Sequence, residues 1–300
     1  MNLLITGAWR EAQEHFAELE AMGHKITFMQ QETDALPCDP AWVEGVICNG
    51  LFLHHPIESF PNLRYIQLTS AGFDRVPMDY VKAHGIEIHN ARGVYSIPMA
   101  EFAVAGVLQL YKQSRFFYEN QKAHRWEKRR DLMELNDKTV LILGCGSVGT
   151  ECAKRFRAFG CRVIGLNRTT RENPVFDEIR PLDELNSALP EADVLILTLG
   201  LSAETRHLMN VERLALLKPG AVLVNLARGA LIDTAALTAA LPKLTGAVLD
   251  VFEEEPLPDT SPLWDAENVI LTPHNSFVGE GNGARLARVI IDSLRKEAIL

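Results

Sequence analysis

The chain has 300 residues, of which 47% are hydrophobic and 23% charged, and its formal net charge is -9 at pH 7. This length is enough for two domains with a core each. The negative charge argues against nucleic acid or an anionic membrane surface as a partner. No run of about 18 apolar residues occurs, and the N-terminal MNLLITG lacks the basic and apolar regions of a signal peptide. We therefore expect a soluble, cytoplasmic protein with no membrane partner.

Cysteine and histidine spacing gives no sign of a metal site. The chain has 5 cysteines and 9 histidines. The cysteines form no C-x-x-C pair, and their odd number suits a reducing compartment better than a disulfide framework. Neither residue type shows the spacing of zinc ligands, so we expect no metal. The adjacent His54 and His55 precede Pro56 and are expected in a solvated loop.

The first 90 residues alternate between short apolar runs and helical patterns. Residues 11–23 have a helical pattern, and the apolar runs lie at residues 2–6, 25–29, 43–50, 63–72 and 86–90. This alternation predicts a parallel sheet covered by helices on both faces. A helix that carries the chain into a second domain is predicted from Ser96, because Pro98 and Glu101 follow the serine and a long apolar stretch comes next.

The rest of the chain repeats this organisation after a charged segment. Residues 123–138 predict a solvated connector, with Trp126 as a packing anchor. Further strands are predicted at residues 139–143, 161–167, 192–199, 221–227, 244–252 and 268–272. The helical pattern over 283–298 is too short to form a domain, so we expect it to pack on the first domain or on the hinge between the domains.

A glycine-rich segment directly follows the predicted strand at 139–143. Its glycines have G-x-G-x-x-G spacing, which permits a tight turn, close approach of a pyrophosphate and close packing of helix on strand. Backbone amides at the start of the next helix then meet the anion. A purely structural glycine turn is the alternative, but the strand–loop–helix context favours dinucleotide binding. The candidate residues are Gly144, Cys145, Gly146, Ser147, Val148 and Gly149.

The next predicted strand ends in Asn167, Arg168 and Thr169. Sites that select NAD usually carry an acidic residue here, which bonds the ribose hydroxyls. Asn167 instead removes repulsion toward a 2′-phosphate, and Arg168 and Thr169 are placed to contact one. We therefore predict a preference for NADP(H) over NAD(H), with a solvated surface charge as the alternative reading of Arg168.

The stretch NVILTPHNSF begins as a buried strand and then breaks. Pro273 ends the strand, so His274 is held in a loop at a strand end, where reactive groups tend to lie. The alternative is a loop histidine that satisfies a local hydrogen bond. This stretch alone leaves both interpretations open.

Several segments together resemble the D-2-hydroxyacid dehydrogenase family, which includes glyoxylate, hydroxypyruvate and phosphoglycerate reductases. The segments are TSAGFD, NARGVYSIPMAEF, the glycine loop, SAETRHLMN, VNLARGALID, DVFEEEPLP and TPHNSF. The resemblance implies two α/β domains of Rossmann-like or flavodoxin-like form with parallel sheets, and an active site in the cleft between them. A substrate domain is expected at 1–97 plus 275–300, and a dinucleotide-binding domain at 98–274. A homodimer is also implied, packed through the helix entry and the connector around Trp126.

The resemblance also assigns roles to individual residues. Arg228 matches the arginine that grips the substrate carboxylate and keto oxygen, which suits its planar fork of donors. His274 matches the acid/base, and Glu255 matches its carboxylate partner, which should favour the imidazolium form. Asp250 is expected to bond the nicotinamide carboxamide, and Ala227 to lie at the cofactor. Backbone amides are expected to bind the substrate carboxylate, with an ordinary turn as the alternative, at Ser70, Ala71 and Gly72.

The implied activity is reduction of a small 2-keto acid to the D-2-hydroxy acid, with hydride from a nicotinamide and a proton from His274. The main alternative is a protein of the same fold that senses NAD(H) without turnover. Formate oxidation fits poorly, since that branch has glutamine at the position of Glu255, and lactate or malate dehydrogenases of the other stereochemistry lack this order of motifs. The chain departs from the common family pattern at Gly200 and in the segment Asn275, Ser276 and Phe277.

Overall fold

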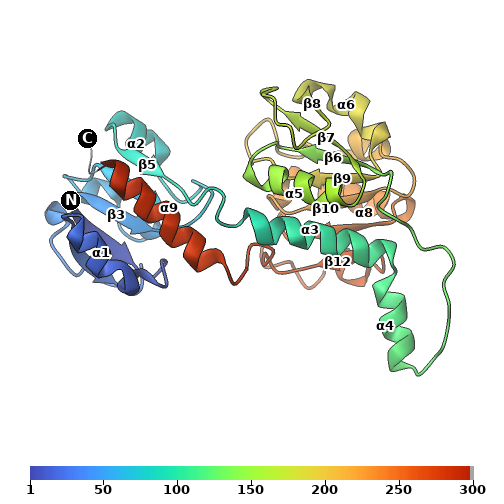
Figure 1. Cartoon of the computed structure of the whole chain (residues 1–300), viewed down its shortest axis with the longest axis horizontal. Coiled ribbons are helices and arrows are strands. Elements are labelled where there is room, and N and C mark those ends of the chain that lie inside the picture. The colour runs from blue at the N-terminus through green and yellow to red at the C-terminus, as the bar shows by residue number, and fades with distance from the viewer. Residues whose placement is uncertain (298–300) are drawn as a thin grey trace. The chain divides into compact units, whose positions relative to one another are not determined.

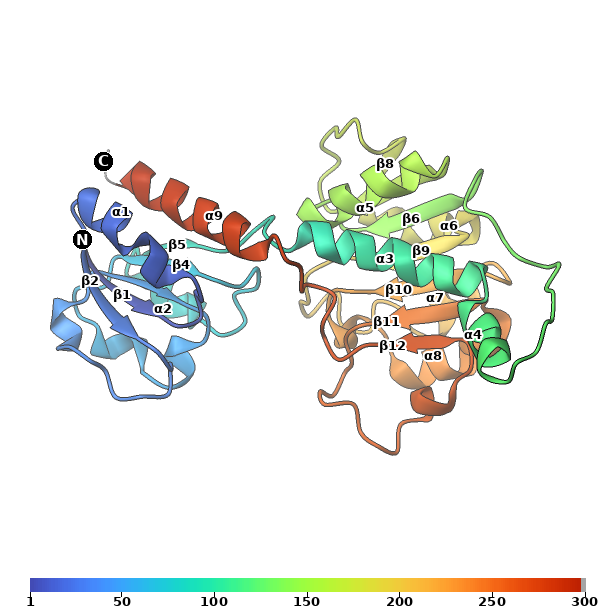
Figure 2. The same ribbon diagram turned by 60° about the horizontal axis from the view of Figure 1, so that its bottom comes forward.

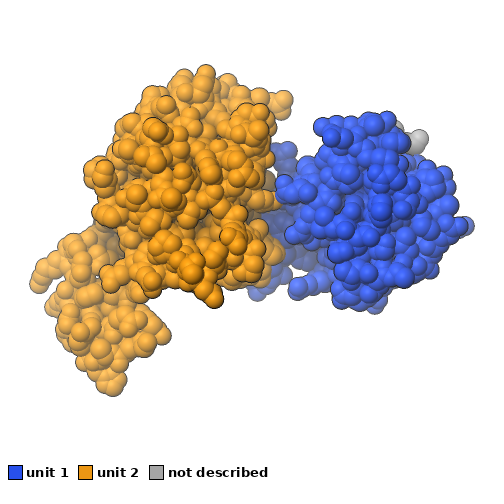
Figure 3. Space-filling view, turned by 180° about the vertical axis from the view of Figure 1, so that it is seen from behind, with its two compact units in different colours: residues 1–95, 279–300 blue, residues 96–278 orange. Residues whose placement is uncertain are grey.

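The computed structural model describes residues 1–297. It divides into two compact units, coloured separately in Figure 3. Unit 1 comprises residues 1–95 and the chain from Gly279 onward, and unit 2 comprises residues 96–278. The assignment of 1–97 plus 275–300 to a substrate domain, and of 98–274 to a dinucleotide-binding domain, stays a prediction. Residues 298–300 lie outside the described residues. They include the last residue of the helix predicted over 283–298 and the end of the predicted substrate domain.

Unit 1 is built on a parallel five-stranded sheet in the order β2-β1-β3-β4-β5 (Figure 1). Both faces of the sheet are apolar, as a parallel sheet covered on both sides requires. In β1, for example, Leu3 and Ile5 belong to one core cluster and Leu4 to the other. The strands are β1 (Asn2–Thr6), β2 (Lys25–Met29), β3 (Gly45–Cys48), β4 (Tyr65–Leu68) and β5 (Glu87–His89), and the helices are α1 (Phe16–Ala21), α2 (Met78–Ala83) and α9 (Asn282–Glu297).

The C-terminal helix α9 completes the core of unit 1, beside α1 (Figures 1 and 2). Its apolar residues recur at helical spacing, so they form one stripe along the helix. This stripe packs on the cluster that contains the fully buried Trp9. The expectation that the C-terminal helix packs back on the first domain is confirmed. The packed residues of α9 are Leu286, Ala287, Ile290 and Leu294.

Unit 2 is built on a parallel seven-stranded sheet in the order β12-β11-β10-β9-β6-β7-β8. Figure 2 shows β10, β11 and β12 side by side. Helices α3 and α5 cover one face, and α6, α7 and α8 cover the other. The strands are β6 (Thr139–Leu143), β7 (Arg162–Asn167), β8 (Glu178–Pro181), β9 (Val194–Leu197), β10 (Val222–Asn225), β11 (Gly246–Leu249) and β12 (Val269–Leu271). The helices are α3 (Ser96–Tyr111), α4 (Ser114–Lys122), α5 (Ser147–Ala158), α6 (Leu185–Ala188), α7 (Val211–Ala215) and α8 (Thr234–Ala240).

Each strand run predicted from the sequence contains one of these strands, and α3 begins at Ser96 as predicted. Strand β8 is an addition that the sequence pattern did not indicate. It lies at the edge of the sheet, is only half-buried and consists of Glu178, Ile179, Arg180 and Pro181. An edge strand needs no alternating apolar face and tolerates proline, so it gives little periodic signal.

Helix α4 and the loop after it project from the rest of unit 2 (Figure 1); we call residues 113–134 the arm. Trp126 lies on the arm and its side chain is 94% exposed. The prediction that Trp126 anchors packing is therefore wrong for residues 1–297 of a single chain, in which the neighbouring residues are charged and this side chain stays almost wholly uncovered. Among residues 1–297, no helix combines the length and apolar character that crossing a membrane requires.

Candidate active site

The loops that carry the predicted cofactor and catalytic residues of unit 2 follow its strands at one end of the sheet. Because every strand is parallel to its neighbours, all their carboxyl ends lie at this end. The strand order reverses between β6 and β9. In open α/β sheets, ligands bind beyond the carboxyl ends at such a switch point.

The glycine loop between β6 and α5 has the geometry that a dinucleotide pyrophosphate requires. Gly144 has φ 103°, a conformation that favours glycine, and a Cβ on Gly149 would stand 2.0 Å from the carbonyl oxygen of Gly144. At Gly146 no atom lies within 4 Å of a Cβ position, so this side of the loop is open. Gly146 caps α5 without a side-chain hydrogen bond, which leaves the first amides of α5 for an anion. The residues present therefore fit a dinucleotide.

The other candidate residues of this loop differ in exposure. The Cys145 thiol points toward Gly165 of β7, where a Cβ would stand 2.4 Å from its sulfur. Burial raises the pKa of Cys145 to about 11, so the thiol stays protonated. Ser147 and Val148 are half-buried in the first turn of α5. The thiol of Cys145 is turned into the fold, so it is not placed to meet a phosphate.

The end of β7 carries the residues expected at the adenosine ribose. The Asn167 side-chain amide donates to Thr169 O at 3.0 Å and to Thr169 Oγ1 at 3.3 Å, which closes a tight turn. Arg168 and Thr169 are exposed. The Ser202 hydroxyl and, less strongly, the charge of Arg168 lower the pKa of Glu204. A carboxylate therefore lies close enough to offset part of the positive charge of Arg168.

Arg228 follows β10 and is held by two side-chain contacts. The Asn225 side chain accepts a hydrogen bond from Ala227 N at 3.1 Å and donates one to Arg228 O at 3.0 Å. The guanidinium of Arg228 donates from Nη1 to Ala227 O at 2.8 Å. Asn225 is buried, so its two hydrogen bonds fix the backbone from which the Arg228 side chain extends. Ala227 is buried beside it.

His274 and Glu255, which are 19 residues apart in sequence, meet beyond the ends of β11 and β12. The His274 Nδ1 lies 2.8 Å from Glu255 Oε2, and the other carboxylate oxygen accepts a hydrogen bond from Phe252 N at 3.0 Å. His274 has φ 49°, which is rare for a residue other than glycine. Its ring is also in edge contact with Phe277, at a centroid distance of 6.2 Å. The imidazole is partly exposed, so one face of it is open to a ligand.

Asp250 is fully buried at the end of β11 and is bonded to the loop that carries His274. Its carboxylate accepts hydrogen bonds from Thr272 Oγ1 at 2.6 Å, Asn275 N at 2.7 Å and Ser276 Oγ at 2.5 Å. The backbone carbonyl of Asp250 also accepts from His274 N at 2.8 Å. These contacts position the loop around His274, whereas the expected contact of Asp250 with the nicotinamide carboxamide stays a prediction.

In unit 1, the loop after β4 contains Ser70, Ala71 and Gly72. The carbonyl oxygens of this loop are all hydrogen-bonded: Ser70 O accepts from Ala91 N at 2.9 Å, Ala71 O from Asn90 Nδ2 at 2.6 Å and Gly72 O from Ser70 Oγ at 3.1 Å. The backbone N–H groups of the same three residues make no hydrogen bond within residues 1–297. A loop with bonded carbonyls and unbonded amides is suited to an anion.

Gly200, where the chain departs from the common family pattern, lies in an open loop after β9. No atom lies within 4 Å of a Cβ position at Gly200. The sequence did not indicate Asn225, Thr272 and Ser276 as residues that hold the loops of Arg228 and His274, nor the contact between His207 and Glu253. Thr272, Ser276 and the His207–Glu253 pair make contacts with distant chain segments, which leave no local spacing pattern, whereas Asn225 bonds residues two and three positions further along the chain. Among residues 1–297, no three His, Cys, Asp or Glu side chains are grouped so that they could hold a metal ion.

The parallel sheet, the glycine loop at its switch point and the histidine–carboxylate pair define a dinucleotide-dependent α/β oxidoreductase. A family model described as D-isomer specific 2-hydroxyacid dehydrogenase, NAD binding domain, matches residues 104–276. Among curated relatives, a glyoxylate reductase of Aeropyrum pernix is 36% identical over 250 residues, covering 78% of this chain and 73% of the relative. An (S)-sulfolactate dehydrogenase of Chromohalobacter salexigens is 32% identical over 242 residues, covering 79% and 78%.

Solved structures extend the similarity to nearly the whole chain. A D-isomer specific 2-hydroxyacid dehydrogenase family protein from Aeromonas salmonicida has a TM-score of 0.84 and 32% identity, covering 98% of this chain and 95% of that one. A relative from Xanthobacter autotrophicus in complex with NADPH has a TM-score of 0.78 and 29% identity, covering 99% and 95%. A D-lactate dehydrogenase from Aquifex aeolicus, complexed with NAD and lactic acid, has a TM-score of 0.80 and 25% identity, covering 98% and 94%.

The chain belongs to the D-isomer specific 2-hydroxyacid dehydrogenase family. It is an NAD(P)-dependent dehydrogenase that acts on a 2-hydroxyacid, and the family and the fold class predicted from the sequence are confirmed. The matched residues 104–276 lie within unit 2, which is therefore the nucleotide-binding part of the chain.

Proposed function

We propose that this dehydrogenase reduces a small 2-keto acid of the glyoxylate or hydroxypyruvate type to the D-2-hydroxy acid, with His274 as the proton donor. The observation that carries the proposal is the 2.8 Å contact between His274 Nδ1 and Glu255 Oε2. This contact orients the ring, and its other nitrogen, Nε2, makes no hydrogen bond within residues 1–297. A histidine with one nitrogen bound to a carboxylate and the other open is suited to proton transfer.

The reaction needs an anion site and a proton donor from this chain. Arg228 offers a planar pair of donors for the substrate carboxylate and keto oxygen. The backbone amides of Ser70, Ala71 and Gly72 offer further donors to the carboxylate. When bound, the reduced nicotinamide supplies the hydride. Protonated His274 then gives its proton to the keto oxygen, and Glu255 holds the ring in place through its contact with Nδ1.

The direction of the pH dependence follows from the proton that His274 carries. Reduction requires the imidazolium, so its rate should fall as rising pH removes that proton. Oxidation of the hydroxy acid requires the neutral imidazole, so its rate should rise over the same range. The charged groups around the ring are Glu255, which contacts it, and Asp250, which bonds the loop on either side of it. A flat profile in both directions, under conditions where chemistry limits the rate, would contradict the role of His274.

Initial rates of NADPH and NADH oxidation with a panel of keto acids test the proposal. The panel contains glyoxylate, hydroxypyruvate, pyruvate and phenylpyruvate, and sulfopyruvate is added because a sulfolactate dehydrogenase is among the relatives. The similarity to glyoxylate reductases supports the small keto acids as the best substrates. Highest kcat/KM with glyoxylate or hydroxypyruvate would support the proposal. A clear preference for phenylpyruvate or sulfopyruvate would replace the substrate class, and cofactor binding without any turnover would favour a nucleotide-sensing protein.

We also propose that NADP(H) is preferred over NAD(H). The support is the neutral Asn167 and the exposed Arg168 and Thr169 at the end of β7. A charge-assisted hydrogen bond of about 1.5–3 kcal/mol to the 2′-phosphate gives a preference of roughly 10- to 150-fold. The Arg168→Ala variant should lose this factor in kcat/KM with NADPH and keep its activity with NADH. Replacement of the neighbouring carboxylate, Glu204→Gln, should raise the NADPH preference slightly.

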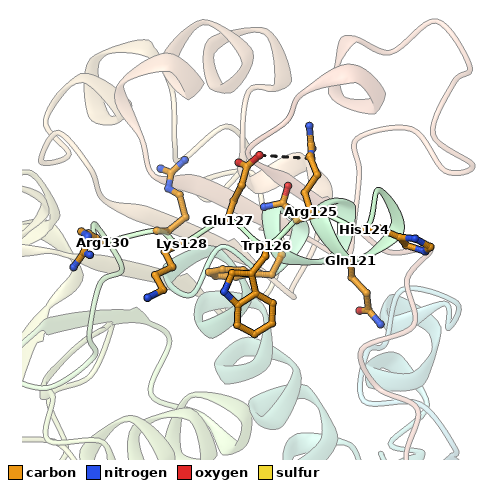
Figure 4. A pocket seen from close by; sticks show the side chains of 10 residues that line it. Gln121, His124, Arg125, Trp126, Glu127, Lys128 and Arg130 are labelled. Atoms are coloured by element: carbon orange, nitrogen blue, oxygen red, sulfur yellow. Dashed lines mark ion pairs between the residues drawn. The ribbon is translucent and has the colours of Figure 1, made fainter.

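A homodimer formed through the arm is the third part of the proposal. Figure 4 shows the side chains that line a hollow of about 660 Å³ on the arm, among them the exposed Trp126. Asn120, on α4, also lines the hollow; it is 3% exposed, and neither polar atom of its side chain has a hydrogen-bond partner within residues 1–297. An exposed tryptophan beside a buried unpaired amide fits a surface that a second copy covers, since aromatic residues are enriched at such interfaces.

Analytical ultracentrifugation of wild type and the Trp126→Glu variant tests the dimer. Wild type should sediment as a dimer, and the variant should shift toward the monomer, because a carboxylate is costly to bury in an apolar contact. The matched control is Trp264→Glu, which changes an exposed tryptophan outside the arm and should remain dimeric. Sedimentation of wild type as a monomer at micromolar concentration would overturn the dimer.

A further inference from the structure

Three consecutive glutamates follow β11, and they have different surroundings. Glu255 is the partner of His274. Glu254 is exposed, and its side chain makes no hydrogen bond or ion pair within residues 1–297. Glu253 has a dense set of contacts: its Oε1 lies 2.5 Å from His207 Nε2, and its Oε2 accepts hydrogen bonds from Thr234 N at 2.9 Å and Thr234 Oγ1 at 2.5 Å. Nothing in the proton transfer described above uses this second histidine–glutamate pair.

Glu253 joins three segments of unit 2 that are far apart in sequence. His207 lies in the loop after β9, Thr234 begins α8, and Glu253 lies in the turn after β11. The His207 loop is also bonded to the segment after Arg228, because His207 N donates to Ala230 O at 2.8 Å. That segment in turn touches the glutamate turn, since a Cβ on Gly229 would stand 1.8 Å from the carbonyl carbon of Phe252.

The same turn sets the direction of the Glu255 carboxylate. Phe252 N donates to Glu255 Oε1 at 3.0 Å, which leaves Oε2 to face His274 Nδ1. The start of the turn is therefore held by Gly229 through backbone contact and by the Glu253 side chain through His207 and Thr234. Its end presents Glu255 to the imidazole.

We propose that Glu253 is a positioning residue for the reaction. It holds Glu255 against His274 and fixes the position of this pair relative to the segment after Arg228. This inference rests on the proposed function. Glu253 acts through Glu255, since its own carboxylate is bonded to His207 and Thr234. His207 is the second residue of this arrangement, because it links the loop after β9 to the Glu253 carboxylate.

The charge state of Glu253 supports this role. Burial raises the pKa of Glu253, but the hydrogen bonds from Thr234 and the neighbouring His207 outweigh that effect, so the pKa is lowered overall. Glu253 is therefore ionised at neutral pH, the form that accepts both hydrogen bonds from Thr234. The titratable groups that face this assembly are His207 on one side and the Glu255–His274 pair on the other, with Asp250 behind the His274 loop.

The same substitution at the three consecutive positions tests the inference, with the pH profile of keto acid reduction as the readout. Glu255→Gln should move the midpoint of the profile to lower pH, because the imidazolium loses its counter-charge. Glu253→Gln should move it in the same direction by a smaller amount and lower kcat by about three- to tenfold, the range that loss of one hydrogen bond gives. Glu254→Gln is the matched control and should behave as wild type.

A purely structural role would lower the melting temperature of Glu253→Gln without moving the pH midpoint, and that result would overturn the inference. If Glu253→Gln does not fold, His207→Gln and Thr234→Val each remove one contact of the same carboxylate, and both should shift the midpoint as Glu253→Gln is expected to. An unchanged midpoint in both would be equally decisive against it. Absence of turnover in wild type would overturn the proposed function first and this inference with it, whereas a midpoint that only Glu255→Gln moves would overturn this inference alone.

Discussion

At both ends of the unit 2 sheet, polar side chains accept hydrogen bonds from backbone N–H groups. These hydrogen bonds hold different parts of the chain at the two ends. At the amino end, Asp193 Oδ2 accepts from Thr139 N at 2.8 Å, and Asp177 Oδ2 accepts from Val163 N at 2.7 Å. Each contact ties the start of one strand to the start of a neighbour. Lys218 adds an ion pair to Asp193 at 3.2 Å. The amino end is therefore built to hold strands together.

At the carboxyl end, the same kind of contact holds loops that carry functional groups. Asn225 brackets the turn that carries Arg228, and Asp250 brackets the loop that carries His274. Unusual backbone conformations occur at both ends, with φ 103° at Gly144 and φ 49° at His274 at the carboxyl end and φ 61° at Asp137, 78° at Gly160 and 82° at Gly220 at the amino end. Such conformations persist only where the surrounding contacts determine them. The comparison implies that damage at the amino end costs stability, whereas damage at the carboxyl end costs activity.

The largest effect is expected at His274. The His274→Gln variant should lower kcat for keto acid reduction by about 10²- to 10⁴-fold, the contribution typical of a general acid. It should leave NAD(P)H binding nearly unchanged, because the glycine loop is untouched. The control is His84→Gln, which changes an exposed histidine of unit 1. A His274→Gln variant that keeps more than a tenth of the wild-type kcat would contradict the proton-transfer role.

The sharpest test of the comparison is to replace aspartate by asparagine at each end of the sheet, in two separate variants. Asp250→Asn places an amide among the donors of the His274 loop, and the loss of charge-assisted hydrogen bonds, each worth about 1.5–3 kcal/mol, should lower kcat/KM by roughly 10- to 100-fold. Asp193→Asn keeps an acceptor for Thr139 and loses mainly a partly exposed ion pair, so unfolding should become easier by only about 1 kcal/mol or less. Its kcat/KM should equal that of wild type.

Steady-state kinetics and thermal unfolding of both variants give the answer. If Asp193→Asn lost as much activity as Asp250→Asn, the division of labour between the two ends would be wrong. If Asp250→Asn lowered stability but kept full activity, Asp250 would be a packing residue only. The two variants serve as controls for each other, since each removes one negative charge from unit 2.

The elements and site residues that the sequence predicts are those with a local pattern. The glycine loop is predictable because Gly144, Gly146 and Gly149 act on one another within a single turn. Arg228 was assigned from the resemblance to the dehydrogenase family, whereas His274 is predictable as a residue near a strand end, because the apolar run over residues 269–271 and Pro273 precede it. The strands of both sheets are predictable for the same reason, since burial on both faces produces continuous apolar runs.

What the sequence could not predict depends on contacts between distant segments. His207 and Glu253 are 46 residues apart, and Asp250 meets Ser276 across 26 residues. No periodic pattern marks such pairs, because their proximity results from the strand order of the folded sheet. Strand β8 was missed because an edge strand need not be apolar, and the exposure of Trp126 depends on what the rest of the arm leaves uncovered.

The glycine loop offers a smaller effect that separates binding from packing at the carboxyl end. A Cβ at Gly146 meets no atom within 4 Å, so Gly146→Ala should keep the melting temperature of the cofactor-free protein. It should weaken NAD(P)H binding by about tenfold, because the methyl group occupies the space where the backbone meets the pyrophosphate. Gly149→Ala, whose Cβ would stand 2.0 Å from Gly144 O, should lower both stability and binding. Equal NAD(P)H affinity of Gly146→Ala and wild type, by fluorescence titration, would exclude this loop from the cofactor site.

The smallest effect is expected in the ion-pair network around Arg180, which is remote from the catalytic loops. Arg180 holds the pKa of Glu191 below its usual range through a hydrogen bond and its charge. A lowered pKa means that the ionised carboxylate stabilises the fold at neutral pH, and that this stabilisation disappears as the pH falls through the lowered pKa. Because Glu191 is partly exposed, Glu191→Gln should destabilise the protein by only about 0.3–1 kcal/mol near neutral pH.

The difference in melting temperature between wild type and Glu191→Gln should therefore shrink as the solution is acidified below the usual range of glutamate, since wild type then carries a protonated, neutral side chain as well. The exposed Glu184→Gln serves as the control and should track wild type at every pH. Activity of Glu191→Gln should stay at the wild-type level, because its contacts fix β7 and β8 and reach none of the loops that carry Arg228, Glu255 or His274. A loss of kcat in this variant would show that the ion pairs around Arg180 are coupled through the sheet to the catalytic loops at its carboxyl end. The hydrogen bonds at the two ends form separate networks, which argues against such coupling.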